Sequence, residues 1–96
     1  MPLYISLVKF TQQGLAAIEG SPDRLEAAKE QLKDMGGEIR AFYLTMGRYD
    51  AVAIVEAPDD ETIAKFSLRS AQAGNVRSEV LPAFEEDDYR RIIAEL

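Results

Sequence analysis

Hydrophobic positions dominate the first segment of the chain, residues 3–10, which reads LYISLVKF. Leu3, Ile5 and Leu7 share one face of the predicted strand and the intervening positions share the other, because strand side chains alternate. Both faces are mostly apolar. The segment therefore predicts a strand that other parts of the protein cover on both sides.

The following segment has the spacing of helices. Residues 12–18 predict one or two helical turns. Ser21 and Pro22 predict the start of a longer helix, since a serine hydroxyl caps free N–H groups and proline suits the first helical position. One apolar stripe then recurs at intervals of three and four residues: Leu25, Ala28, Leu32 and Met35. This is the pattern of an amphipathic helix, and the glycine pair at 36–37 ends it.

From residue 38 onward the sequence predicts three further strands and two further helices. The sequence predicts strands over Glu38–Met46 and Ala51–Glu56, a helix within 57–74, a strand within Asn75–Phe84 and a helix within 85–96. The order β-α-β-β-α-β plus a C-terminal helix predicts an α+β, ferredoxin-like fold. This fold has a four-stranded antiparallel sheet with two helices on one face. The length favours a single domain over residues 1–96.

The predicted third strand, residues 51–56, is apolar at nearly every position. A sheet with one solvated face is expected to alternate more cleanly between apolar and polar residues. An uncovered face of this kind would also exceed the apolar patches that monomers usually expose. Either the C-terminal helix or a second subunit is therefore expected to cover it. We expect a homo-oligomer, either a dimer or an assembly of dimers.

Composition excludes several classes of function. The net charge of −6 argues against nucleic acid and anionic membranes as partners. The chain has no Cys and no His, which removes thiol chemistry, the usual general base and the commonest metal ligand. No apolar run has the length of a membrane span, and the N-terminus does not resemble a signal peptide. We expect a cytoplasmic protein without a metal or cofactor.

The tetrapeptide at Gly47, Arg48, Tyr49 and Asp50 has two interpretations. In the structural one, Gly47 supplies a positive φ, Asp50 accepts from a backbone N–H in the turn, and Tyr49 packs on a neighbouring helix or a partner. In the functional one, the segment forms the rim of a ligand site. Arg48 would pair with an anionic group and Tyr49 would donate a hydrogen bond.

Three other features have alternative interpretations of the same kind. Lys9 acts as a base or Schiff-base former if it lies in an apolar cleft, or reaches solvent from the strand end. Arg77 and Glu79 form an ion pair at an oligomer contact or lie on a solvated edge. The acidic run at 85–88 is a helix start, although its oxygens also suit a divalent cation. No catalytic constellation emerges.

Three motifs, in order along the chain, resemble the GYD-domain family of small prokaryotic proteins. They are KFTQQG after the first strand, GRYDAVAIVEAPDDE, and GNVRSEVLPAF after the second helix. The resemblance implies a ferredoxin-like architecture similar to that of the dimeric α/β-barrel proteins, in which two open sheets pack face to face. It implies no established activity, because that group includes enzymes, stress proteins and binding modules.

The sequence therefore supports a homo-oligomeric small-molecule-binding or regulatory module with a pocket between sheet and helices. Its candidate ligand-binding residues are Lys9, Arg48, Tyr49 and Asp50. The alternative is a cofactor-free oxygenase or isomerase of the dimeric α/β-barrel type that uses Lys9, Tyr49 or Asp50. A third interpretation is a subunit that docks on another protein and has a filled interior.

Overall fold

The computed structural model describes residues 1–96 and contains one antiparallel sheet with the strand order β2-β3-β1-β4. The strands are β1 (Leu3–Phe10), β2 (Glu38–Leu44), β3 (Ala51–Glu56) and β4 (Val76–Ala83). The α-helices are α1 (Gln12–Ala16), α2 (Ser21–Asp34), α3 (Asp60–Gln72) and α4 (Glu86–Ala94), with a 3-10 turn at Ile18–Gly20. The strand order results from two β-α-β units whose strands pair antiparallel in one sheet. This arrangement confirms the predicted ferredoxin-like α+β fold.

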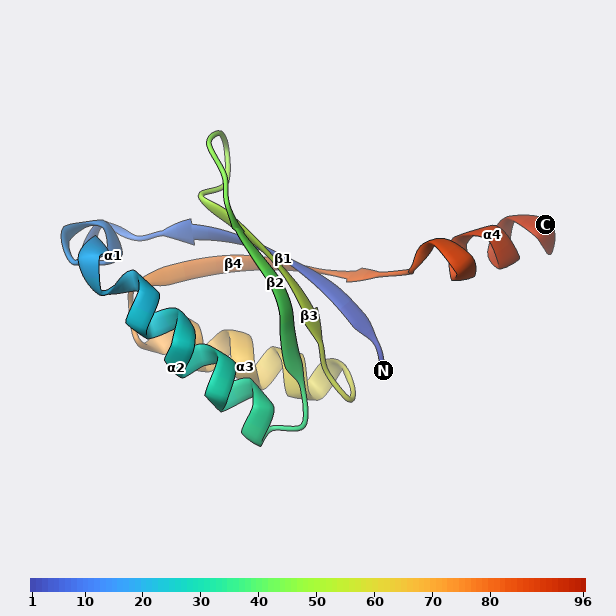
Figure 1. Ribbon diagram of the computed structural model, residues 1–96, viewed down its shortest axis with the longest axis horizontal. Helices are drawn as coiled ribbons and strands as arrows, with labels where there is room; N and C mark the ends of the chain where they lie inside the picture. The colour runs from blue at the N-terminus through green and yellow to red at the C-terminus, as the bar shows by residue number, and fades with distance from the viewer.

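Helices α2 and α3 lie on one face of the sheet, and the core forms beneath them (Figure 1). Six buried residues build it: Tyr4, Leu32, Ala53, Val55, Ala57 and Ile63. Strand alternation explains why Ala53 and Val55 of β3 enter this core while Val52 and Ile54 between them face the other side. The phenol of Tyr4 donates a hydrogen bond to the carboxylate of Asp60 in the first turn of α3.

The helix ends differ in one respect from the sequence prediction. Ser21 is the first residue of α2 and does not cap it, because Gly20 occupies the cap position and no side chain bonds there. The Ser21 hydroxyl is left without that role. In α3, by contrast, the carboxylate of Asp59 accepts from the backbone N–H of Thr62 at 2.8 Å. The hydrogen bond from the Thr62 hydroxyl, together with this backbone bond, lowers the pKa of Asp59.

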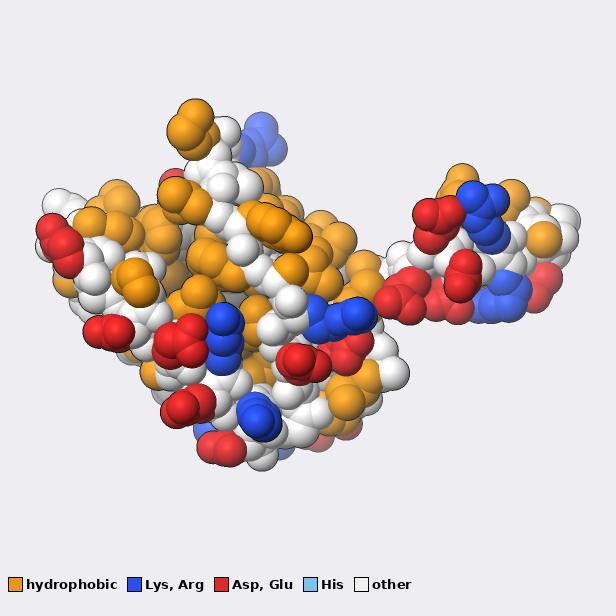
Figure 2. All heavy atoms as spheres, in the orientation of Figure 1, with side chains coloured by type: hydrophobic (Ala, Val, Ile, Leu, Met, Phe, Trp, Pro, Cys, Tyr) orange, Lys and Arg blue, Asp and Glu red, His pale blue; other side chains and the backbone are white.

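The second face of the sheet is uncovered, because α4 runs away from it beyond the end of β4 (Figure 1). The molecule is 49 Å long, and its radius of gyration is 14.3 Å, against about 12.5 Å for a compact chain of this length. Figure 2 shows hydrophobic side chains over the strands between the β2–β3 hairpin and α4. The C-terminal helix is therefore not the cover of this face within one subunit. None of the helices combines the length and apolar composition of a membrane-spanning segment.

Candidate functional site

Asp50 joins two strands that are far apart in the sequence. Its carboxylate accepts from the backbone N–H of Phe10 at 2.9 Å, and its own N–H donates to the carbonyl of Val8 at 2.8 Å. Its carbonyl accepts from Thr45 across the hairpin. The prediction of a partner within the turn is wrong, because Phe10 belongs to the neighbouring strand β1. Asp50 extends the β1–β3 pairing by one step, because the carboxylate replaces a strand carbonyl.

Tyr49 crosses β1 and contacts the edge strand β4. Its hydroxyl donates to the carboxylate of Glu79, and its backbone carbonyl accepts from the Thr45 hydroxyl at 2.7 Å. The ammonium group of Lys9 lies 5.7 Å from the centre of the Tyr49 ring, within the range of a cation–π contact. Lys9, Tyr49 and Glu79 therefore form one polar cluster at the end of the open sheet face.

The electrostatics of this cluster keep the phenol protonated. The hydrogen bond to Glu79 raises the pKa of Tyr49, and the neighbouring Arg48 opposes part of that rise. A phenol with a raised pKa donates a hydrogen bond but is a poor base at neutral pH. Lys9 is exposed at the end of β1, which matches the interpretation of a strand-end lysine.

The other residues of the loop face solvent. Gly47 adopts a φ of +152°, in the region that L side chains rarely occupy, and no atom lies within 4 Å of the position of an added Cβ. Arg48 is exposed beside it. The predicted site residues thus lie together on one loop and the adjoining strand. The contacts of Asp50 and Tyr49 join strands, and Arg48 lies beside Tyr49 at the exposed surface.

The remaining charged candidates have different surroundings. Arg77 is exposed and makes no ion pair with Glu79, whose carboxylate accepts from Tyr49 instead. The acidic run begins α4, where Glu86 pairs with Arg90 at 2.7 Å. Carboxylates in the first turn of a helix and ion pairs four residues apart stabilise such a helix.

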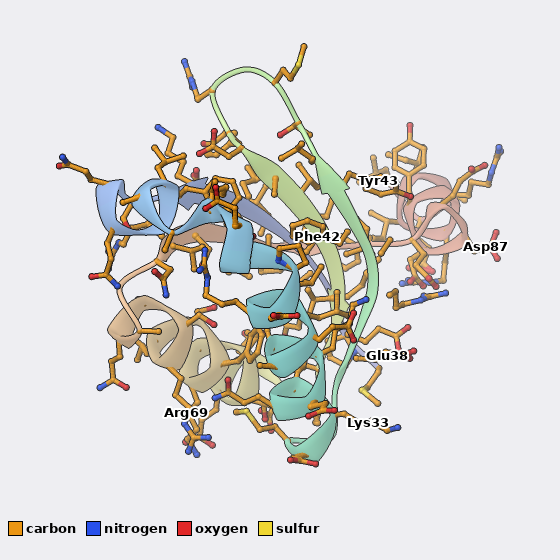
Figure 3. The ribbon with its side chains drawn as sticks, turned by 60° about the vertical axis from the view of Figure 1, so that its left-hand side comes forward. Lys33, Glu38, Phe42, Tyr43, Arg69 and Asp87 are labelled. Atoms are coloured by element: carbon orange, nitrogen blue, oxygen red, sulfur yellow. The ribbon has the colours of Figure 1, made fainter.

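A cavity of about 290 Å³ lies between the sheet and helices α2 and α3. Figure 3 shows Phe42 between β2 and α2, whereas its neighbour Tyr43 points away from the helices. Phe42, Phe66 and Val80 border the core but are only partly buried. None of the four predicted site residues lines this cavity. The structure therefore has a pocket where the sequence placed one, with a different lining.

Sequence reasoning missed the polar lining of the cavity, although a signal was present. Ser6 lies on the same strand face as Tyr4 and Val8, and Ser78 lies on the same face as Val76 and Val80. Serines at these positions interrupt the apolar pattern of each strand and make the cavity lining partly polar. Their hydroxyls stay accessible to solvent, since no buried side-chain polar atom lacks a hydrogen-bond partner.

Comparisons with known proteins agree with this architecture. The family model of the GYD domain matches residues 4–93. A Thermus thermophilus relative named "Glutamine synthetase and cystathionine beta-lyase binding protein" is 34% identical over 89 residues, which cover 92% of this chain and 94% of the relative. A crystal structure of a Thermus thermophilus protein superposes with a TM-score of 0.55 at 23% identity, covering 88% of this chain and 95% of that one, and supports the fold. The chain belongs to the GYD domain family.

Proposed function

We propose that this chain is a homo-oligomeric binding module that holds a small molecule and regulates a partner protein. The open apolar face of the sheet is the observation that carries the proposal. Ile5 and Leu7 of β1, Val52 and Ile54 of β3, and the exposed Leu81 of β4 share this face. Apolar side chains spread over three adjacent strands favour burial against another protein surface.

A second copy of the chain is the proposed cover of this face. Packing of this face against the same face of a second copy requires no other protein, and two-fold dimers are the commonest protein oligomers. The Lys9, Tyr49 and Glu79 cluster borders the apolar area, so it would form the polar rim that protein interfaces usually have.

Light scattering of the purified chain at micromolar concentration tests the self-association. We expect the mass of a dimer or an assembly of dimers. Leu81→Lys places a charge on the open face at an exposed position and should lower the mass to that of a monomer. Leu68→Lys, at an exposed position of α3, is the matched control and should leave the mass unchanged. A monomer mass for the unmodified chain would refute the self-association.

A partner enzyme of amino-acid metabolism is the second element of the proposal. The Thermus thermophilus relative carries glutamine synthetase and cystathionine beta-lyase in its name. We infer a protein partner of this class for the present chain too. The β2–β3 hairpin offers a surface for it, since Leu44 and Met46 are 74% and 98% exposed.

Biolayer interferometry with the two purified enzymes from the same organism as the chain tests this inference. Binding to one or both is expected, and Met46→Ser should weaken it without changing the melting temperature. Leu15→Ser is the control, because Leu15 is exposed on α1 rather than on the hairpin. Absence of binding to both enzymes would contradict a partner of this class.

A further inference from the structure

All five serines of the chain line the cavity between the sheet and the two helices. Ser6 comes from β1, Ser21 from α2, Ser67 and Ser70 from α3, and Ser78 from β4. The side-chain hydrogen bonds of the protein involve threonine, tyrosine, amide and charged groups but no serine hydroxyl. Four separate elements therefore each bring to this space at least one serine whose hydroxyl makes no hydrogen bond within the protein.

The charged side chains that line the cavity are all positive. The chain has 17 acidic residues, yet no Asp or Glu lines the cavity, and its charged residues are Arg24 and Arg69. Figure 3 shows Arg69 pointing away from the body of the protein, so only its stem borders the space. Arg24 is half-buried and makes no ion pair. A positive group without a carboxylate nearby favours an anionic ligand.

Arg24 is held at one end of the cavity. Its guanidinium donates to the carbonyl of Ala17 at 2.9 Å and to that of Gly14 at 3.5 Å. Gly14 lies against the backbone of Asn75, which also lines the cavity. A guanidinium has five N–H donors, so these two bonds fix the group and leave donors for a ligand.

The cavity also has a large apolar lining. Ile39 pairs with Val55 across β2 and β3, and Ile63 of α3 belongs to the same core. Phe42 and Phe66 lie at the edge of this core and are only partly buried, so they present free apolar surface. The volume of about 290 Å³ is near the lower limit of small-molecule sites, so a small ligand suits this space.

The geometry points to a small carboxylate with an apolar or aromatic body as the ligand of this cavity. Its carboxylate binds Arg24 and nearby serine hydroxyls, and its body packs on Phe42 and Phe66. The inference rests on the proposed small-molecule-binding function and specifies the class of ligand.

Titration of the ¹⁵N-labelled full chain by NMR tests the assignment with phenylacetate, hexanoate and the uncharged analogue phenylacetamide. The carboxylates should shift the backbone amides of Ser6, Ser67 and Ser78 and should bind at least about tenfold more tightly than the amide, the usual advantage of a charged hydrogen bond. Arg24→Gln should remove that advantage while phenylacetamide still binds. Equal affinities of phenylacetate and phenylacetamide for the unmodified chain would overturn the anionic class.

A second variant covers the case in which Arg24→Gln unfolds the chain. Ala28 lines the cavity from α2, so Ala28→Leu should fill it and abolish the amide shifts. Ala64→Leu adds the same volume at an exposed position of α3 and should leave binding unchanged. Binding that survives Ala28→Leu, or no shift with either carboxylate, would overturn the site. Light scattering of the same samples separates this failure from that of the proposed oligomer.

Discussion

Replacement of Asp50 by alanine tests whether the loop residue is structural. The carboxylate is the hydrogen-bond acceptor for the partly buried N–H of Phe10 at 2.9 Å. Asp50→Ala leaves that donor unpaired, at a cost of about 1–3 kcal/mol in the free energy of unfolding. For a chain of this size each kcal/mol lowers the melting temperature by about 4–8 °C. Asp50→Asn retains an amide oxygen as acceptor and should cost under about 1 kcal/mol.

Thermal and urea unfolding of the two variants provide the measurement. Asp87→Ala is the matched control, because it removes one negative charge from an exposed position of α4, the helix that runs away from the sheet (Figure 1). Hydrogen exchange at the Phe10 amide should accelerate in Asp50→Ala and remain slow in Asp87→Ala. Equal melting temperatures for these two variants would refute the structural role. A ligand-binding role of Asp50 instead predicts unchanged stability and loss of a ligand-induced thermal shift.

Two further predictions concern buried contacts near the core. The hydrogen bond to Asp60, with burial, raises the pKa of Tyr4 to about 12, whereas an unfolded tyrosine titrates near pH 10. The contribution of Tyr4 to stability should therefore be fully present below pH 10 and be lost as the pH rises toward 12. Urea midpoints should fall less over this pH range in Tyr4→Phe, which lacks the titrating group. An added Cβ at Gly14 would lie 2.1 Å from the carbonyl oxygen of Asn75. Gly14→Ala should cost about 1–3 kcal/mol by thermal unfolding, more than Gly20→Ala, where the nearest atom is the flexible end of Arg24.

The local pattern of the chain predicted the elements well, because each is defined by spacing along the sequence. Alternation in residues 3–10 and intervals of three and four after Ser21 need no knowledge of distant contacts. The apolar run at 51–56 correctly indicated a strand, and the helices cover one of its faces. The sequence of one strand does not indicate what covers its second face. The amphipathic C-terminal segment predicted a helix, but its direction depends on the few residues between β4 and α4.

The candidate site was harder to predict than the elements, because it depends on contacts between residues that are distant in the sequence. In the structural interpretation of the GRYD segment Asp50 holds the turn, yet the partners of Asp50 and Tyr49 are Phe10 and Glu79. These residues are 40 and 30 positions away. Such partners depend on the strand order and register, which local sequence does not determine. The serine-lined cavity was harder to predict, since its polar groups come from two strands and two helices and meet only in the folded chain.

The open sheet face and the cavity lie on opposite faces of β1, and this arrangement explains the composition of that strand. Ser6 faces the cavity, whereas its neighbours Ile5 and Leu7 face the open side. Only nine of the 96 residues are buried in one subunit, so both surfaces leave apolar area in contact with water. A second copy and a ligand each bind the folded state, and each therefore increases its stability by mass action. The strand that links the two surfaces has to be apolar on both sides, which is the property that first distinguished it in the sequence.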